Sequence, residues 1–284
     1  MRTQARIVPL STAIAELVHD GDTLALEGFT HLIPVAAGQE IIRQRKRDLT
    51  LVRMTPDIVY DQLIGAGCAR KLVFSWGGNP GVGSLYRLRD AITAGWPGPL
   101  EIEEHTHAGL ANRYVAGASG LPFAVLRAAA GTDLTRHSPA VATVACPFTG
   151  EHLTAVAALN PDVTIVHAQR VDRNGNVQLW GISGVQKEAV LAARRAIATV
   201  EEVVDELTPM PGGVVLPRFT IDAVAVVPGG AAPSYALGYY DRDNAAYLEW
   251  EKISRDREAF TAWLRRIEKG ESTKGEPDVQ RGEP

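Results

Sequence analysis

A turn near the N-terminus combines the residue types that best fit chemistry in this chain. Residues 23–26 predict a short apolar strand, and an amphipathic stretch begins at Val35. Between them lie five candidate substrate-binding residues: Glu27, Gly28, Phe29, Thr30 and His31. Ligands bind at the carboxyl ends of strands in open α/β sheets, and Gly28 permits close backbone approach. Amides at the start of the following helix can face an anion or a developing oxyanion, so the turn predicts an enzyme of acyl chemistry.

A second candidate wall begins at Ser75, the last polar residue of a strand predicted over residues 71–76. Its hydroxyl can donate a hydrogen bond to a carboxylate or thioester oxygen of a substrate. Gly77 and Gly78 again admit close approach of the backbone. Residues 77–83 hold four glycines and one proline, which predicts a loop rather than a regular element. A plain strand-end loop is the alternative interpretation.

A third candidate is the acidic and histidine-rich run at residues 101–107. If the whole run is a strand, Glu101, Glu103, His105 and His107 share one face, because strand side chains alternate. Glu104, His105 and His107 are then candidate acid/base groups, with burial raising a carboxylate pKa. Alternate strand histidines can also chelate a metal, but no third ligand lies nearby in sequence, so we predict no metal site. A solvated acidic edge remains open.

These motifs resemble the first-subunit signature of the family I coenzyme A transferases, in particular α subunits of the glutaconate CoA-transferase type. The resemblance starts with Asp20-Gly21-Asp22 and the Gly28 to His31 turn, and it extends to about residue 268. Further matching segments lie at residues 47–51, 63–67, 120–123, 146–151, 168–176, 227–231 and 239–243. One departure is that Glu27 stands where the family usually has the first glycine of Gly-Gly-Phe.

The resemblance implies a transferase that moves CoA between an acyl-CoA and a free carboxylic or dicarboxylic acid. Family I enzymes use a glutamate that attacks the thioester and then carries CoA as an enzyme thioester. In heteromeric members this glutamate lies on the second subunit, in a Ser-Glu-Asn-Gly-like turn, and this chain contains no Glu-Asn-Gly. We therefore expect an α subunit that shapes the pocket, a β subunit that brings the nucleophile in an αβ heterodimer or larger assembly, and coenzyme A as substrate without a permanently bound cofactor.

Two other functions stay open at this point. Some members of the superfamily are ring-opening hydrolases of cyclic acyl-CoA substrates, in which Glu104, His105 and His107 would supply the acid and base. A non-catalytic ligand-sensing module is a third possibility, because related open-sheet folds serve as regulator domains. A dinucleotide site is not expected, since residues 77–83 do not reproduce Gly-x-Gly-x-x-Gly.

Alternation of helices and short apolar strands predicts the fold. We expect an α/β protein with an open, mostly parallel twisted sheet and helices on both faces, like the CoA transferases and sugar-phosphate isomerases. Expected strands cover residues 23–26, 49–53, 71–76, 100–104, 162–167, 198–203 and 223–227. Expected helices cover residues 12–19, 36–45, 57–65, 85–93, 108–118, 185–196, 244–252 and 256–268. Asn174-Gly175 predicts a hairpin turn.

Composition and length agree with one globular domain. The chain has 284 residues, of which 45% are hydrophobic and 22% charged, and its net charge of −4 gives no basic footprint for nucleic acid or a membrane surface. Two widely separated cysteines, Cys68 and Cys146, do not define a disulfide framework, so we expect a cytoplasmic protein. We predict one domain over residues 1–268 and a disordered, charged tail over residues 269–284.

Overall fold

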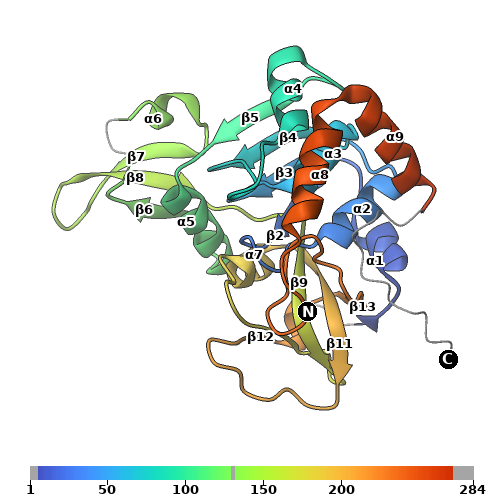
Figure 1. Cartoon of the computed structure of the whole chain (residues 1–284). Helices are drawn as coiled ribbons and strands as arrows, with labels where there is room; N and C mark the ends of the chain where they lie inside the picture. Colours follow the sequence, from blue (N-terminus) through green and yellow to red (C-terminus); the bar gives the residue numbers. More distant parts are fainter. Residues whose placement is uncertain (1–5, 129–131, 271–284) are drawn as a thin grey trace.

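A mixed sheet forms the centre of the molecule (Figure 1). The structure is a computed structural model that describes residues 6–128 and 132–270. The strand order is β1-β13-β11-β9-β2-β3-β4-β5, with β10 and β12 joined at one side, and the strands on the main path pair in parallel. These strands are β1 Arg6–Ile7, β2 Thr23–Glu27, β3 Leu49–Arg53, β4 Ala69–Phe74, β5 Glu101–Glu104, β9 Val163–Asp172, β10 Val177–Leu179, β11 Arg195–Val204, β12 Val214–Leu216 and β13 Ala223–Val226.

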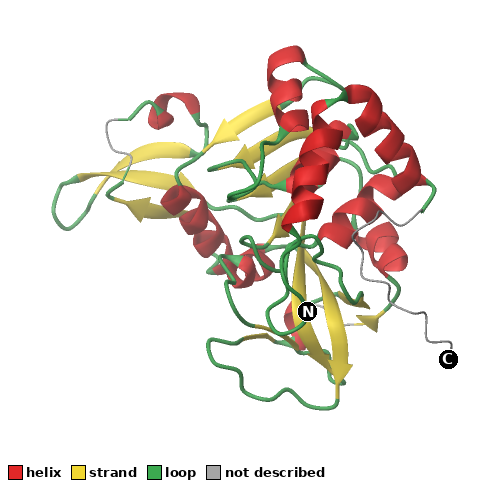
Figure 2. Cartoon of the chain, viewed as in Figure 1, coloured by secondary structure: helices red, strands yellow, loops and turns green. Residues whose placement is uncertain are grey.

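Helices cover both faces of this sheet (Figure 2). The larger core packs one face against α1 Leu10–Leu17, α2 Val35–Arg43, α3 Ile58–Gly65, α4 Tyr86–Ala94, α8 Asn244–Arg255 and α9 Arg257–Glu268. On the other face, Ala25, Val52 and Val73 pack against α5 His107–Ala118 and α7 Gln186–Ala192. The expected open, mostly parallel sheet with helices on both faces is confirmed.

A small antiparallel sheet projects from this body, and we call it the arm. It consists of β6 Phe123–Leu126, β7 Val141–Ala145 and β8 His152–Ala157, in the order β6-β8-β7. Figure 1 shows the arm beyond the end of β5, with the short helix α6 Leu134–His137 beside it. The apolar content of residues 122–126 and 141–144 suggested further buried segments, but β8 and the separate sheet were not predicted.

Several element boundaries follow from local chemistry. The Asp57 carboxylate caps α3 by accepting from Val59 N, and Asp243 and Asp256 cap the two closing helices in the same way. Those helices bring Trp250, Phe260 and Trp263 together as expected, with the Trp250 and Trp263 ring centroids 4.8 Å apart. The Asn174-Gly175 hairpin is also confirmed, since β9 and β10 pair antiparallel and Gly175 has φ +86°.

Three expectations were wrong in detail. Ser11 does not cap the first helix, which begins at Leu10 after Pro9. Residues 132–140 are not only loop, because they include α6. The strand in the acidic run ends at Glu104 and His107 begins α5, because the Thr106 hydroxyl accepts from Gly109 N and starts the helix there. The predicted tail falls almost entirely on residues 271–284, which lie outside the described residues, so the domain boundary stays a prediction.

No helix among the described residues is both long and apolar enough to cross a membrane.

Candidate functional site

The Gly28 turn is tightly closed at the carboxyl end of β2. A Cβ atom added to Gly28 would lie 2.6 Å from the carbonyl oxygen of Leu32, so only glycine fits. Thr30 and Leu32 both have positive φ, 58° and 52°, which adds local backbone strain. The Ser234 hydroxyl donates to Thr30 O at 2.9 Å and holds the turn against the loop after β13.

His31 is fully buried and holds this turn from inside. Its Nδ1 lies 3.2 Å from Ile182 O, and its Nε2 accepts from Leu237 N at 2.9 Å. An acceptor at Nε2 requires the neutral ring with its proton on Nδ1. Burial lowers the pKa of His31 and favours that neutral form. We infer that His31 positions the turn, while Phe29 packs beside Gly184.

Glu27 lies beneath the turn rather than on an open wall. Only 2% of its surface is exposed, and Oε1 accepts a 2.8 Å hydrogen bond from Tyr114 Oη. Burial raises the pKa of Glu27 to about 7, although Arg53 and the Tyr114 hydrogen bond lower it. The carboxyl group therefore titrates near neutral pH, inside the protein, at the point where the family usually has a glycine.

Arg53 is a residue of this region that the sequence analysis missed. Its guanidinium binds Asp57 through two hydrogen bonds of 3.0 and 2.8 Å, and it donates to Gly28 O at 2.7 Å. Both side chains of the ion pair are buried. An arginine at the end of β3 followed four residues later by an aspartate was the available signal. The pair fixes the position of the Gly28 carbonyl and supports the turn.

The loop after β4 lies at the same edge of the sheet. Ser75 is committed to the backbone, because its hydroxyl donates to Met54 O at 2.7 Å. Gly78 N donates to Pro56 O, and Gly77 has room above Leu88 and Phe74. Asn79, which the sequence analysis did not select, is only 4% exposed, and neither its Oδ1 nor its Nδ2 has a hydrogen-bond partner in the described part of the chain. Unpaired buried amides are costly, so Asn79 is a candidate for contact with a ligand or a second chain.

The acidic run does not form the predicted acid/base group. His105 is buried and its Nε2 lies 2.7 Å from Glu103 Oε1, while Arg113 Nη1 lies 2.8 Å from the same oxygen. Lys71 Nζ contacts Glu103 Oε2 at 2.8 Å. The hydrogen bond from His105, together with Lys71 and Arg113, strongly lowers the pKa of Glu103. Glu104 and His107 are instead exposed, so the structure does not bring them together with His105.

Arg113 gives this cluster a structural role. Its Nε donates to Ala157 O at 3.0 Å, so one side chain on α5 ties β5 of the body to β8 of the arm. A cavity of about 380 Å³ lies next to this cluster, lined by Ile102, Glu103, Glu104, Thr132, Asp133, Leu134, His137 and Ser138. The carboxyl end of β5 and the segment that leads into β7 thus face one hollow.

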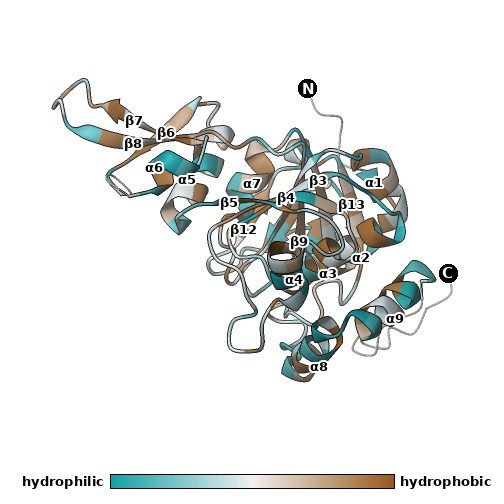
Figure 3. Ribbon diagram, turned by 90° about the horizontal axis from the view of Figure 1, so that it is seen from above, coloured by the Kyte–Doolittle hydropathy of each residue, from teal (hydrophilic) through white to brown (hydrophobic). Residues whose placement is uncertain are grey.

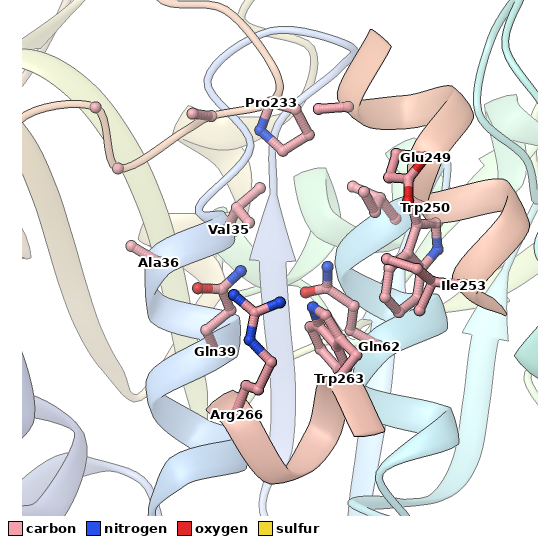
Figure 4. A pocket seen from close by; sticks show the side chains of 15 residues that line it. Val35, Ala36, Gln39, Gln62, Pro233, Glu249, Trp250, Ile253, Trp263 and Arg266 are labelled. Atoms are coloured by element: carbon pink, nitrogen blue, oxygen red, sulfur yellow. The ribbon is translucent and has the colours of Figure 1, made fainter. Parts of the chain in front are cut away.

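A second cavity of about 260 Å³ lies between α2, α3, α8 and α9 (Figure 4). Trp250, Trp263 and Ile253 form its apolar wall, and the amides of Gln39 and Gln62 point into it from the two neighbouring helices. Across residues 6–128 and 132–270, no three His, Cys, Asp or Glu side chains gather as a possible metal site.

Known proteins match this chain along most of its length. The model of the family named Coenzyme A transferase matches residues 8–226. The chain belongs to the coenzyme A transferase family. The α subunit of the 3-oxoadipate CoA-transferase of Pseudomonas knackmussii is 66% identical over 92% of each chain. The α subunit of the glutaconate CoA-transferase of Acidaminococcus fermentans is 32% identical over 92% of this chain and 87% of its own. These matches confirm the family resemblance and an enzyme of the transferase class.

Solved structures of this coenzyme A transferase family extend the match to three dimensions. The crystal structure of glutaconate coenzyme A-transferase from A. fermentans superposes with a TM-score of 0.85, at 30% identity over 96% of this chain and 90% of that chain. The decarboxylase AibA/AibB gives a TM-score of 0.81 at 33% identity, over 94% of this chain and all of that chain. The cholesterol ring-cleaving hydrolase IpdA subunit of Rhodococcus jostii is more distant, at 27% identity over 90% of each chain.

Proposed function

We propose that this chain is the α subunit of a heteromeric CoA-transferase that acts on 3-oxoadipate or a closely similar dicarboxylic acid. The 66% identity to the corresponding subunit of a 3-oxoadipate CoA-transferase, over 92% of both chains, is the observation that carries this proposal. The 32% identity to the corresponding subunit of a glutaconate CoA-transferase supports a dicarboxylic acid as the substrate class.

The nucleophile comes from a β subunit in this proposal. A transferase glutamate must reach the thioester carbon with a free carboxylate. At the carboxyl edge of the sheet Glu27 is buried against Tyr114, and Glu103 is held by Lys71, His105 and Arg113. Glu104 is exposed, but it lacks the Glu-Asn-Gly context of the family nucleophile. A glutamate on the partner then attacks the acyl-CoA and carries CoA as a thioester.

This chain supplies the walls around that glutamate. Backbone groups of the Gly28 turn and of the Gly77–Gly78 loop line the substrate path, with the Asn79 amide as the polar group that orients the acid or the thioester. Stabilisation of a developing oxyanion by one well-aimed donor contributes about 3 kcal/mol in comparable enzymes. Ser75 and His31 hold these loops rather than touch the substrate, because their polar atoms are already bonded to the protein.

Purification with and without the β subunit tests the proposal. We expect exchange of CoA between succinyl-CoA and 3-oxoadipate only when both chains are present. Trapping the intermediate with borohydride and locating it by mass spectrometry should modify a glutamate of the β subunit. Full activity of this chain alone, or a CoA adduct on one of its own side chains, would contradict the split site.

A ring-opening hydrolase is the competing function, and the same assay separates the two. Labelled acid supplied as acceptor becomes a labelled CoA ester only through a transferase. The separation of His105 from Glu104 and His107 argues against the hydrolase acid/base set, and the IpdA relatives are far less similar than the transferase relative from P. knackmussii.

A further inference from the structure

The arm has an apolar face that the rest of the described chain leaves open. In the register of β6, β8 and β7, Phe123 lies opposite Ala157, while Val125 and Ala142 both lie opposite Ala155. Directly opposed residues share one side of a sheet. We call this side the outer face, made of Phe123, Val125, Ala142, Ala155 and Ala157. Phe123 is 42% exposed and Val125 45%, and Figure 3 shows the arm extending away from the body.

The opposite side of the arm is the covered one. Val141, Thr154 and Val156 are buried there, and a Cβ on Gly109 of α5 would lie 4.0 Å from Val156 Cγ1. An antiparallel sheet that packs one face on a core and shows the other to water alternates apolar and polar residues. Phe123 to Leu126 and Ala155 to Ala157 do not alternate, because all of these residues are apolar. This pattern is typical of a sheet that is covered on both faces.

The arm adjoins the edge where the second subunit must bind. Arg113 bonds both Ala157 O in the arm and Glu103 in β5, and the 380 Å³ cavity separates β5 from the segment before β7. A glutamate supplied from outside has to approach the carboxyl ends of β2 and β4, on the same side of the body as the end of β5. A chain docked on the arm is therefore well placed to deliver it.

We propose that the outer face of the arm is a docking surface for the β subunit, through an apolar patch of the partner. This inference rests on the proposed function, which requires a partner at this edge. The outer face carries no charged side chain, and cores of permanent interfaces are depleted of charge and enriched in aromatic and aliphatic groups. The decarboxylase relative with full coverage of its chain is itself named as two components, AibA/AibB.

Charge placed on this face tests the surface. We would produce this chain carrying Phe123→Lys and Val125→Lys together with the β subunit, and measure assembly by light scattering and the Kd by sedimentation. Burying two unpaired ammonium groups should weaken association at least about 100-fold. Ile92→Lys is the matched control, because Ile92 is 54% exposed on α4 in the body, and it should assemble as the unchanged chain does.

Two results would overturn the docking surface. One is unchanged assembly of the double variant, and the other is equal loss with Ile92→Lys. A homodimer of the isolated chain that the double variant splits would also overturn it, since a second copy would then cover the face.

A labelling experiment covers the case in which the lysine variant does not fold. Val125→Cys in a Cys146→Ser background should react with a maleimide in the free chain and lose at least about tenfold in rate when the β subunit is bound. Ile92→Cys should keep its rate, and equal rates at Val125→Cys with and without partner would contradict the docking surface. Both readouts report assembly, so a complex that assembles but fails to use 3-oxoadipate would contradict the proposed function alone.

Discussion

Tyr114 donates a 2.8 Å hydrogen bond to Glu27, which joins the middle of α5 to the end of β2 across the sheet face. One residue earlier on the same helix, Arg113 bonds Glu103 and Ala157 and so connects the body to the arm. Two successive residues of α5 therefore fix the floor of the Gly28 turn and the root of the arm. A change at either position should be felt at both places.

Glu27→Gln should alter the pH dependence of stability. The pKa of this carboxyl group is about 7 in the folded protein and 4.5 for an ordinary glutamate, so the folded state holds the proton more tightly. This contribution is present below pH 4.5 and is lost as the pH rises through 7, a loss of about 3 kcal/mol. Burial also raises the pKa of Asp61 to about 7, so the variant should reduce the fall between pH 5 and pH 8 without abolishing it.

Urea denaturation at a series of pH values measures this effect. Glu258→Gln, at an exposed position in the first turn of α9, is the control and should keep the full pH dependence. Parallel stability curves for Glu27→Gln and the unchanged chain would show that Glu27 does not titrate in this range.

Arg53→Met should destabilise the protein strongly. It leaves Asp57 buried without its ion-pair partner and removes the hydrogen bond to Gly28 O, a loss of about 3–5 kcal/mol. The double variant Arg53→Met with Asp57→Leu should recover part of that loss, because no unpaired charge remains. A double-mutant cycle of thermal unfolding checks this, and additive effects of the two substitutions would rule out the coupling.

Gly28→Ala should disrupt the turn, because the new Cβ would lie 2.6 Å from Leu32 O and 2.9 Å from His31 O. Both contacts are with backbone, so the turn itself must move, and we expect a stability loss of about 2 kcal/mol or more and little remaining transferase activity. Gly98→Ala is the matched control, since nothing lies within 4 Å of its added Cβ. Equal activity of the two variants in the assembled enzyme would contradict a role for the turn.

Asn79→Ala should separate binding from folding. Because neither amide atom of Asn79 has a partner in the described chain, removing the amide should leave thermal stability unchanged or slightly raised. If the amide orients the substrate, kcat/KM should fall about tenfold or more. Asn112→Ala on α5, which removes a side-chain bond to Ala108 O, is the control and should keep its activity. A loss of stability without a loss of kcat/KM would assign Asn79 to the fold instead.

Glu104→Gln and His107→Ala should each change the transferase kcat/KM less than about twofold, because both side chains are exposed and separate from the His105 cluster. A hydrolase that used them as acid and base would lose about 100-fold or more. Steady-state rates of the assembled enzyme with each variant distinguish the two outcomes.

The sequence by itself determined the layout of the body and the position of the turns. Period-two and helical patterns are local, so β3 begins and ends where residues 49–53 predicted, and Asn174-Gly175 forms the expected hairpin. The Gly28 turn was also predictable, since a strand, a glycine and a helix in succession place it at the carboxyl edge. The absence of Glu-Asn-Gly already indicated that a second chain brings the nucleophile.

Tertiary structure alone decided what each polar residue does. Glu27 was expected on an open wall, yet Tyr114, 87 residues later, encloses its carboxyl group. His105 was expected to act with Glu104 and His107, but Arg113 and Lys71 arrive from α5 and β4 and commit it to Glu103. Burial, partner geometry and the resulting pKa depend on residues distant in sequence, and no local pattern encodes which of them meet. The arm follows the same rule, because the order of its strands exists only through pairing across intervening segments.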